Sequence, residues 1–123
     1  MTVDDGYKIA LALIGETGSD YDGVLMPLVN LLMAEMFAVN NSIRACNGEN
    51  VLSEIPVVVN RSDSFVYDRA LISEVLPYGL AAKLIIEDNR SLYNAMNYEY
   101  CNRLEKYSRG VATVISDYYC EGE

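Results

Sequence analysis

The 123-residue sequence contains no histidine and no tryptophan, and it has only nine basic residues against eighteen acidic ones. Without histidine the chain lacks the commonest general base, the commonest ligand of transition metals and the base of Ser-His and Cys-His nucleophiles. The net charge of −9 provides no basic surface for nucleic acid or anionic lipid. We therefore expect no catalytic residues, no metal site and no cofactor, and these absences favour a scaffold or interaction protein.

Cysteine is also scarce, with three residues at wide spacings and no CxxC pair: Cys46, Cys101 and Cys120. Free thiols in a reducing compartment are the expected state. The acidic start, Met-Thr-Val-Asp-Asp, is unlike a secretory signal peptide. The most apolar run, 24–39, is interrupted by Asn30 and Glu35 and is shorter than the roughly 20 residues of a membrane span. We expect a soluble protein without a membrane partner.

The apolar content is high enough for a folded core, at 51% of residues with only three prolines. A chain of this length predicts one domain, 1–123. Apolar residues at helical spacing predict four helices, at about 3–15, 24–46, 69–86 and 91–109. Thr2 and Asp5 have the spacing of a capping box at the start of the first helix. The expected fold is mainly α, a compact bundle of about four helices.

Two segments have the composition of β-strands. The arm, residues 50–67, contains the β-branched run Ile-Pro-Val-Val-Val at 55–59 and a turn cluster at 62–64, which predicts a short hairpin or an extended arm. Such a piece is marginal alone, so it must pack on the helices, join a partner's strand, or both. The C-terminal tail, 111–123, is also strand-like. These segments and the last helix supply the candidate interface residues Val57, Val59, Phe65, Tyr107, Val114, Ile115, Tyr118 and Tyr119.

The predicted helix 69–86 is apolar on two faces, which indicates a central position. Pro77 should kink it, and the small residues Gly79, Ala81 and Ala82 allow a neighbouring helix to approach closely. The 77–79 segment is either a hinge that bends on docking or a fixed kink, and the fixed kink is the commoner meaning.

A few polar and aromatic residues also admit two interpretations. Glu35 is either a buried acid or a residue at the edge of its apolar stripe. Asp63 and Asp68 either bind a cation together or serve the turn and the helix cap, and turn and cap duties explain both. Tyr93 and Tyr100 fit an intramolecular core better than a partner surface.

The order of these elements resembles a known family. Residues 76–84 read Leu-Pro-Tyr-Gly-Leu-Ala-Ala-Lys-Leu and precede an acidic turn, Glu-Asp-Asn, at 87–89. The next helix carries Tyr100, Leu104 and Tyr107. Together with Ala-Leu-Ile-Gly-Glu at 12–16 and Leu-Val-Asn-Leu-Leu at 28–32, this pattern resembles the head-to-tail adaptor proteins of tailed phages and prophages, also called connector, gatekeeper or head-completion proteins. The matches cover about residues 9–107.

The resemblance implies a non-enzymatic structural protein of the virion neck, made in the cytoplasm of the bacterial host. It implies a homo-oligomeric ring, a dodecamer in this family, that sits on the portal protein and offers a platform for a tail or stopper protein. The interface candidates would then contact neighbouring subunits or the portal. A lumen lined with carboxylates would let DNA pass without sequence-specific binding, because phosphates are not attracted to it. The alternatives are another phage neck or tail-completion protein, or a small helical regulatory binding module.

Overall fold

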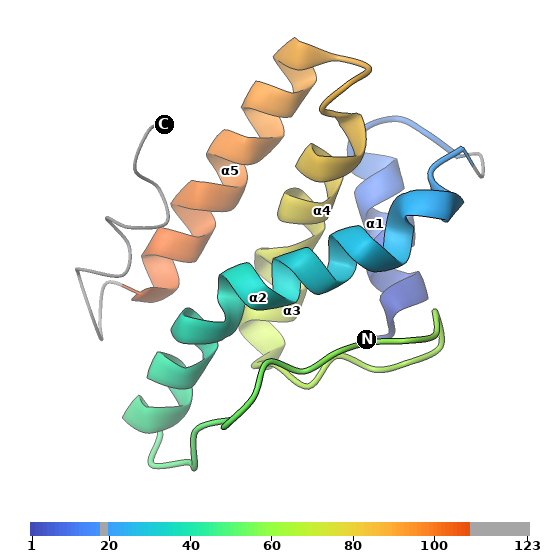
Figure 1. Ribbon diagram of the computed structural model, residues 1–123. Coiled ribbons are helices and arrows are strands. Elements are labelled where there is room, and N and C mark those ends of the chain that lie inside the picture. Colours follow the sequence, from blue (N-terminus) through green and yellow to red (C-terminus); the bar gives the residue numbers. More distant parts are fainter. Residues whose placement is uncertain (18–19, 109–123) are drawn as a thin grey trace.

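The computed structural model describes residues 1–17 and 20–108, and 67% of these residues are helical, which confirms a mainly helical fold (Figure 1). Within the described residues there is no strand. The helices follow one another as α1 Val3–Leu13, α2 Asp22–Cys46, α3 Arg69–Glu74, α4 Leu76–Ile85 and α5 Arg90–Ser108. The predicted tail, 111–123, lies outside the described residues.

The first helix begins as the sequence predicts. The Thr2 hydroxyl accepts a hydrogen bond from the Asp5 N–H at 3.2 Å, and the Asp5 carboxylate accepts one from the Thr2 N–H at 3.1 Å. This capping box satisfies two N–H groups that have no partner inside the helix. After α1, Gly15 takes a φ of 73°, a left-handed conformation that favours glycine.

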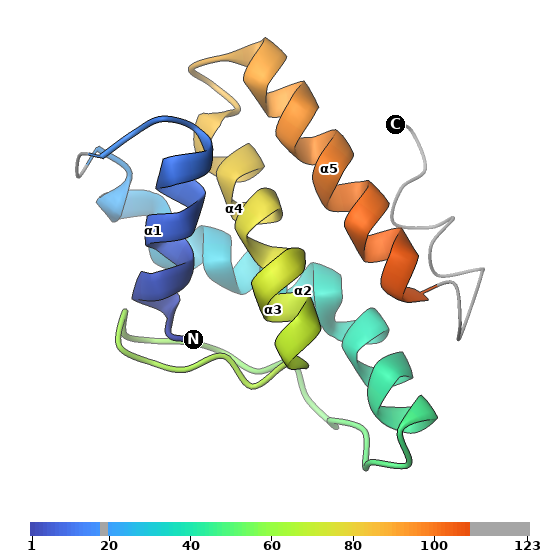
Figure 2. The same cartoon turned by 180° about the vertical axis from the view of Figure 1, so that it is seen from behind.

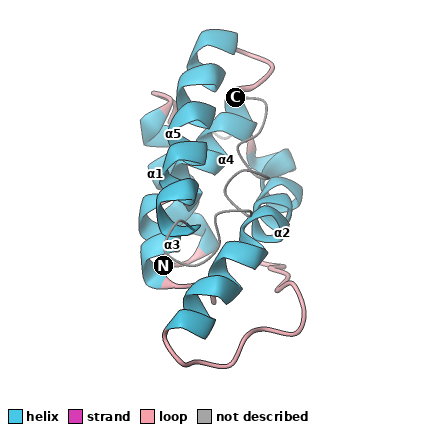
Figure 3. Cartoon of the chain, turned by 90° about the vertical axis from the view of Figure 1, so that its left-hand side faces the viewer, coloured by secondary structure: helices cyan, strands magenta, loops and turns pink. Residues whose placement is uncertain are grey.

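The longest helix, α2, crosses the other helices obliquely (Figures 1 and 3). It begins two residues earlier than expected, at Asp22, and Tyr21 occupies the N-cap position. By length and composition α2 could cross a membrane, with a mean hydropathy of 1.5 over an 18-residue window of which 33% is buried. Both the core helix of a soluble protein and a signal sequence near an N-terminus have this length and composition.

The helix expected at 69–86 is divided into α3 and α4 at Val75, where φ is −111° and ψ is −49° (Figure 2). The break precedes Pro77, which lies in the first turn of α4. Proline has no N–H to donate to the carbonyl of Ser73, four residues back, so the hydrogen-bond pattern of α3 cannot continue through it. The division of this helix therefore has its cause in the sequence.

Helix α4 lies at the centre of the molecule and packs on every other helix. Eight of its ten residues are buried, among them the predicted packing residues Pro77, Gly79, Ala81 and Ala82. A Cβ at Gly79 would lie 2.7 Å from Leu32 of α2 and 2.8 Å from Tyr100 of α5. The close approach of three helices thus depends on a residue without a side chain.

The arm forms no hairpin ladder, so that version of the prediction is wrong and the extended alternative describes it. Its two limbs run out and back (Figures 1 and 2), but the β-bridge in the described chain pairs Ser64 with Thr2. The returning limb bonds to the start of α1, through Val3 N–H to the Asp63 carbonyl at 2.9 Å and Phe65 N–H to the Met1 carbonyl at 3.1 Å. The arm is therefore held in place by contacts with the helices and not by pairing between its own limbs.

Candidate interaction surface

The outgoing limb of the arm is held by asparagine side chains of α2. Asn30 Nδ2 donates to the Val58 carbonyl at 3.0 Å, and Asn30 Oδ1 accepts from the Val58 N–H at 2.9 Å. Asn41 makes the same pair of bonds with the backbone of Leu52, at 3.0 and 2.9 Å. Each asparagine amide uses one N–H donor and its oxygen acceptor on the same backbone residue. It therefore makes the pair of hydrogen bonds that a neighbouring strand would make at that position.

The side chains on either side of Val58 point away from the molecule. Val58 is only 6% exposed, whereas Val57 is 70% and Val59 is 72% exposed, the highest values among the large exposed hydrophobic residues described. Successive side chains of an extended chain alternate between its two faces, which explains this contrast. The local sequence Val-Val-Val therefore places one valine in the core and two in solvent.

The backbone of this limb also has an open edge. Because the N–H and C=O of Val58 face Asn30, the corresponding groups of Val57 face the opposite way. Among the hydrogen bonds of residues 1–17 and 20–108, none uses the backbone of Val57. The edge is therefore open at Val57, although the Val59 N–H on the same edge is bonded to Asp63. An open extended edge with apolar side chains is the kind of surface that accepts a strand from another chain. We use the name arm edge for the side chains of Val57 and Val59 together with the open backbone edge at Val57.

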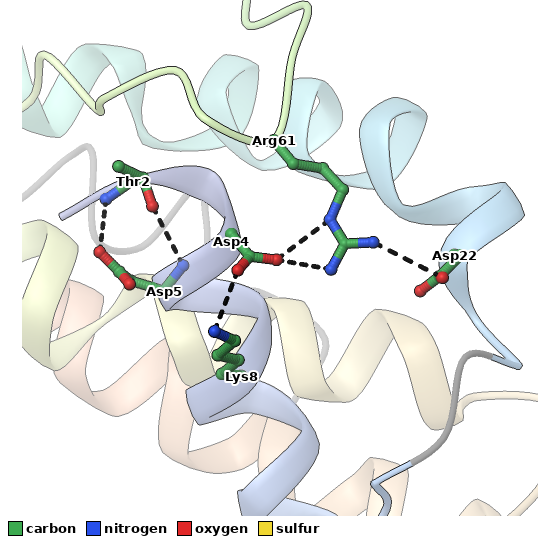
Figure 4. A network of polar contacts seen from close by, with 6 residues as sticks. All are labelled: Thr2, Asp4, Asp5, Lys8, Asp22 and Arg61. Carbon is green, nitrogen blue, oxygen red and sulfur yellow. Dashed lines mark hydrogen bonds and ion pairs between the residues drawn. The ribbon is translucent and has the colours of Figure 1, made fainter.

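The tip of the arm is fixed by an ionic cluster (Figure 4). The guanidinium of Arg61 pairs with the Asp4 carboxylate of α1 at 2.5 Å and with the Asp22 carboxylate of α2 at 3.5 Å. It also lies 5.0 Å from the centre of the Tyr7 ring, whose hydroxyl donates to Asp22 at 2.7 Å. The hydrogen bond from Arg61 lowers the pKa of Asp4, and burial followed by the Asp22 hydrogen bond raises the pKa of Tyr7 to about 12.

The turn beside the tip is closed by Asp63, whose carboxylate accepts from the N–H groups of Val59 at 2.8 Å and Asn60 at 2.9 Å. These backbone bonds hold the pKa of Asp63 below its usual value. Asp63 thus serves the turn. Asp68 occupies the N-cap position of α3, but its side chain makes no capping hydrogen bond, so the cap duty expected of it is not seen. In the described part of the chain, no group of three or more acidic or cysteine residues is placed to hold a metal ion.

Two other interface candidates contact the chain's own elements. Phe65 is half-buried, and its ring covers Gly6 of α1. Tyr107 is half-buried as well, and its hydroxyl donates to the carboxylate of Glu74 in α3, a bond that raises the pKa of Tyr107 to about 12. The remaining candidates, Val114, Ile115, Tyr118 and Tyr119, lie outside the described residues. The arm edge is therefore the part of the predicted interface that the structure places in solvent.

Inside the fold, Glu35 joins three helices. Its carboxylate pairs with Lys83 of α4 at 2.7 Å and accepts from the Tyr100 hydroxyl of α5 at 2.8 Å. The side chain of Glu35 remains 31% exposed, so it lies between the two positions considered from the sequence. Both of its oxygens are occupied by the protein, which gives it a structural role.

Sequence reasoning missed the two asparagines that hold the arm. In the sequence, Asn30 only interrupts an apolar run, and Asn41 belongs to no recognisable motif. Their spacing is a usable signal, because eleven residues make about three helical turns and place both side chains on one face. An amide pair on one face of an apolar helix indicates that a backbone segment is bonded there.

No family model, curated protein or solved structure matches the chain. The case for a function therefore rests on the sequence resemblance and on the surface described above.

Proposed function

We propose that the chain is a non-enzymatic structural protein of a tailed-phage or prophage virion, a head-to-tail adaptor that assembles as a ring on the portal protein. By the resemblance the ring is twelvefold, extends the DNA channel and offers a platform to a tail or stopper protein. The observation that supports docking on another protein is the arm edge, where Val57 and Val59 are 70% and 72% exposed and the backbone of Val57 makes no hydrogen bond in the described residues.

The physical argument starts from the cost of that exposure. Burying a valine side chain contributes about 1.5–3 kcal/mol, and pairing the free backbone groups adds the specificity of a strand contact. The edge is fixed beforehand by Asn30, Asp63 and Arg61, so little conformational freedom is lost when a partner binds. A fixed apolar edge fits a lasting structural contact such as that between adaptor and portal.

The charge distribution agrees with a conduit for DNA. Acidic residues outnumber basic ones two to one, and several exposed carboxylates carry this excess: Asp20, Glu49, Glu54, Glu87 and Asp88. A lumen lined by such groups would let a duplex slide without adhering to it. Carboxylates on the outer wall, with Arg90 and Arg103 lining the lumen, would contradict this part of the proposal.

The direct test is electron microscopy of the protein mixed with portal particles of the same phage genome. We expect an added ring of density below the portal, concentric with its channel. Portal particles that remain unchanged at saturating protein would contradict the adaptor assignment and favour a regulatory binding module, which needs one apolar surface and no ring.

A further inference from the structure

The start of the chain, the returning limb of the arm and α3 enclose a cavity of about 360 Å³. Its floor is apolar, since Tyr67 and Ile72 are each only 5% exposed. The volume lies within the range of ligand pockets, so the cavity has room for a large side chain. The lining residues are Met1, Phe65, Tyr67, Arg69, Ile72 and Ser73.

The charge of this cavity is opposite to that of the whole molecule. Arg69 is exposed, and none of the ion pairs of residues 1–17 and 20–108 uses it. None of the described lining residues is acidic. The neighbouring carboxylates, Glu74 and Asp68, both lie close enough to Tyr107 of α5 to raise its pKa, chiefly through the hydrogen bond to Glu74. In a chain with a net charge of −9, an unpaired cation beside an apolar floor favours an occupant that is both apolar and acidic.

The C-terminal tail, 111–123, has this combination of properties. It contains three acidic residues and no basic one. Its β-branched and aromatic composition predicts an extended chain, in which alternate side chains share a face. Tyr119 would then share a face with Asp117 and Glu121, so that an aromatic ring is flanked by two carboxylates.

The tail begins close enough to reach the cavity. Tyr107, in the last turn of α5, bonds to Glu74 of α3, which follows the lining residue Ser73. Figure 2 shows α3 between the end of α5 and the start of the chain. Tyr119 is eleven residues beyond Ser108, a length that spans up to about 36 Å when extended, about three times the width of a helix. The tail can therefore pass α3.

A second cavity is a poorer site for the tail. It lies between the first turns of α2 and the end of α4 and has a volume of about 340 Å³. Its lining includes the carboxylates of Asp20, Glu87 and Asp88, which would repel an acidic segment. Its lysine, Lys83, is already paired with Glu35 at 2.7 Å.

We propose that the tail of this chain folds back over α3 and docks in the cavity beside Arg69. Tyr119 rests on the apolar floor, and the carboxylates of Asp117 and Glu121 face the guanidinium. The contact lies within one chain, so it needs no second copy and does not rest on the proposed function. Tyr118, on the opposite face of an extended tail, stays available to a partner.

Proteolysis of the full chain tests the docking. Chymotrypsin cleaves after tyrosine, and the rate at Tyr119, relative to the same chain unfolded in urea, measures how often the tail is released. Arg69→Glu should speed cleavage at least about threefold, and so should Asp117→Lys with Glu121→Lys. All three substitutions together should restore protection, because the facing charges are opposite again. Arg90→Glu makes the same change of net charge away from the cavity and should leave the rate unchanged.

Four results would overturn the inference. They are a wild-type tail cleaved as fast as that of Arg69→Glu, an Arg90→Glu chain cleaved equally fast, a charge-reversed tail that stays protected, and a triple variant that fails to recover. Protection that increases with protein concentration would also overturn it, and would assign the cavity to the tail of a second copy. Thermal unfolding checks that each variant is folded. If Arg69→Glu is not, Arg69→Gln takes its place and should speed cleavage in the same direction.

Discussion

One side chain, Asn30, binds both backbone polar groups of one residue, Val58, at 3.0 and 2.9 Å. The pair joins the middle of α2 to a segment 28 residues away that has no ladder of its own. Because Val58 is turned inward by these bonds, Val57 and Val59 are turned outward. The Asn30 amide thus sets which valines of the arm edge face solvent, while Asp63 and Arg61 hold the neighbouring turn and tip.

Replacing Asn30 by alanine should release the outgoing limb of the arm. The buried N–H and C=O of Val58 would lose both partners, which costs about 1–3 kcal/mol of unfolding free energy. Denaturant unfolding measures that loss, and hydrogen exchange should show faster exchange at the Val58 amide. Asn94→Ala, on the exposed face of α5, is the control and should change stability by less than about 0.5 kcal/mol. An equal loss in both variants would contradict the anchoring role.

Adding one methyl group at Gly79 should destabilise the core. The new Cβ would meet Leu32 at 2.7 Å and Tyr100 at 2.8 Å, so α2 and α5 would have to move apart, at a cost of about 1–3 kcal/mol. Gly23→Ala is the matched control, because no atom lies within 4 Å of its Cβ and alanine favours the helix there by up to about 1 kcal/mol. Thermal unfolding of the two variants should shift in opposite directions, and a stable Gly79→Ala protein would refute the close helix contact.

Three tyrosines should ionise late in an alkaline titration. A carboxylate partner and burial raise the pKa of Tyr7, Tyr21 and Tyr107 to about 12. Since these folded-state values exceed the ordinary value of 10, the stability they contribute is complete below pH 10 and is lost as the pH rises towards 12. Tyrosinate absorbance should therefore show a late component that accompanies unfolding.

The variant Glu74→Gln assigns part of that component. Removing the negative partner should lower the pKa of Tyr107, so one tyrosine of the late group ionises at lower pH. Glu99 supplies the control, because its carboxylate pairs with Arg103 and not with a tyrosine hydroxyl. The variant Glu99→Gln should therefore leave the tyrosine titration unchanged. A single transition of all ten tyrosines near pH 10 would contradict these contacts.

Local patterns predicted the helices well, because their causes are local. The capping box of Thr2 and Asp5 formed as expected. At the start of α5 the Asn89 side chain accepts from the Leu92 N–H at 3.0 Å, a cap of the same local kind. The left-handed residue after α2 is Gly48, with φ of 77°. Pro77 signalled a bend, yet the break lies at Val75, because a proline disrupts the bonding of the turn before it.

The arm could be predicted only in outline. β-branched residues indicate an extended chain, but they do not say whether it pairs with itself or with a helix. The deciding contacts, from Asn30, Asn41 and Arg61, join residues far apart in the sequence. Val57 and Val59 were predicted as interface residues only because the segment is β-branched. Their exposure has another cause, the anchoring of Val58 by the distant residue Asn30.

The most direct test of the central claim is the binding of the chain to portal particles when the arm edge is altered. Val57→Asp with Val59→Asp should weaken that binding more than about tenfold, because two carboxylates would have to be buried in the contact. Leu31→Asp with Val66→Asp adds the same charge at other exposed apolar positions and should bind as the wild type does. Equal binding by all three proteins would contradict docking through the arm edge.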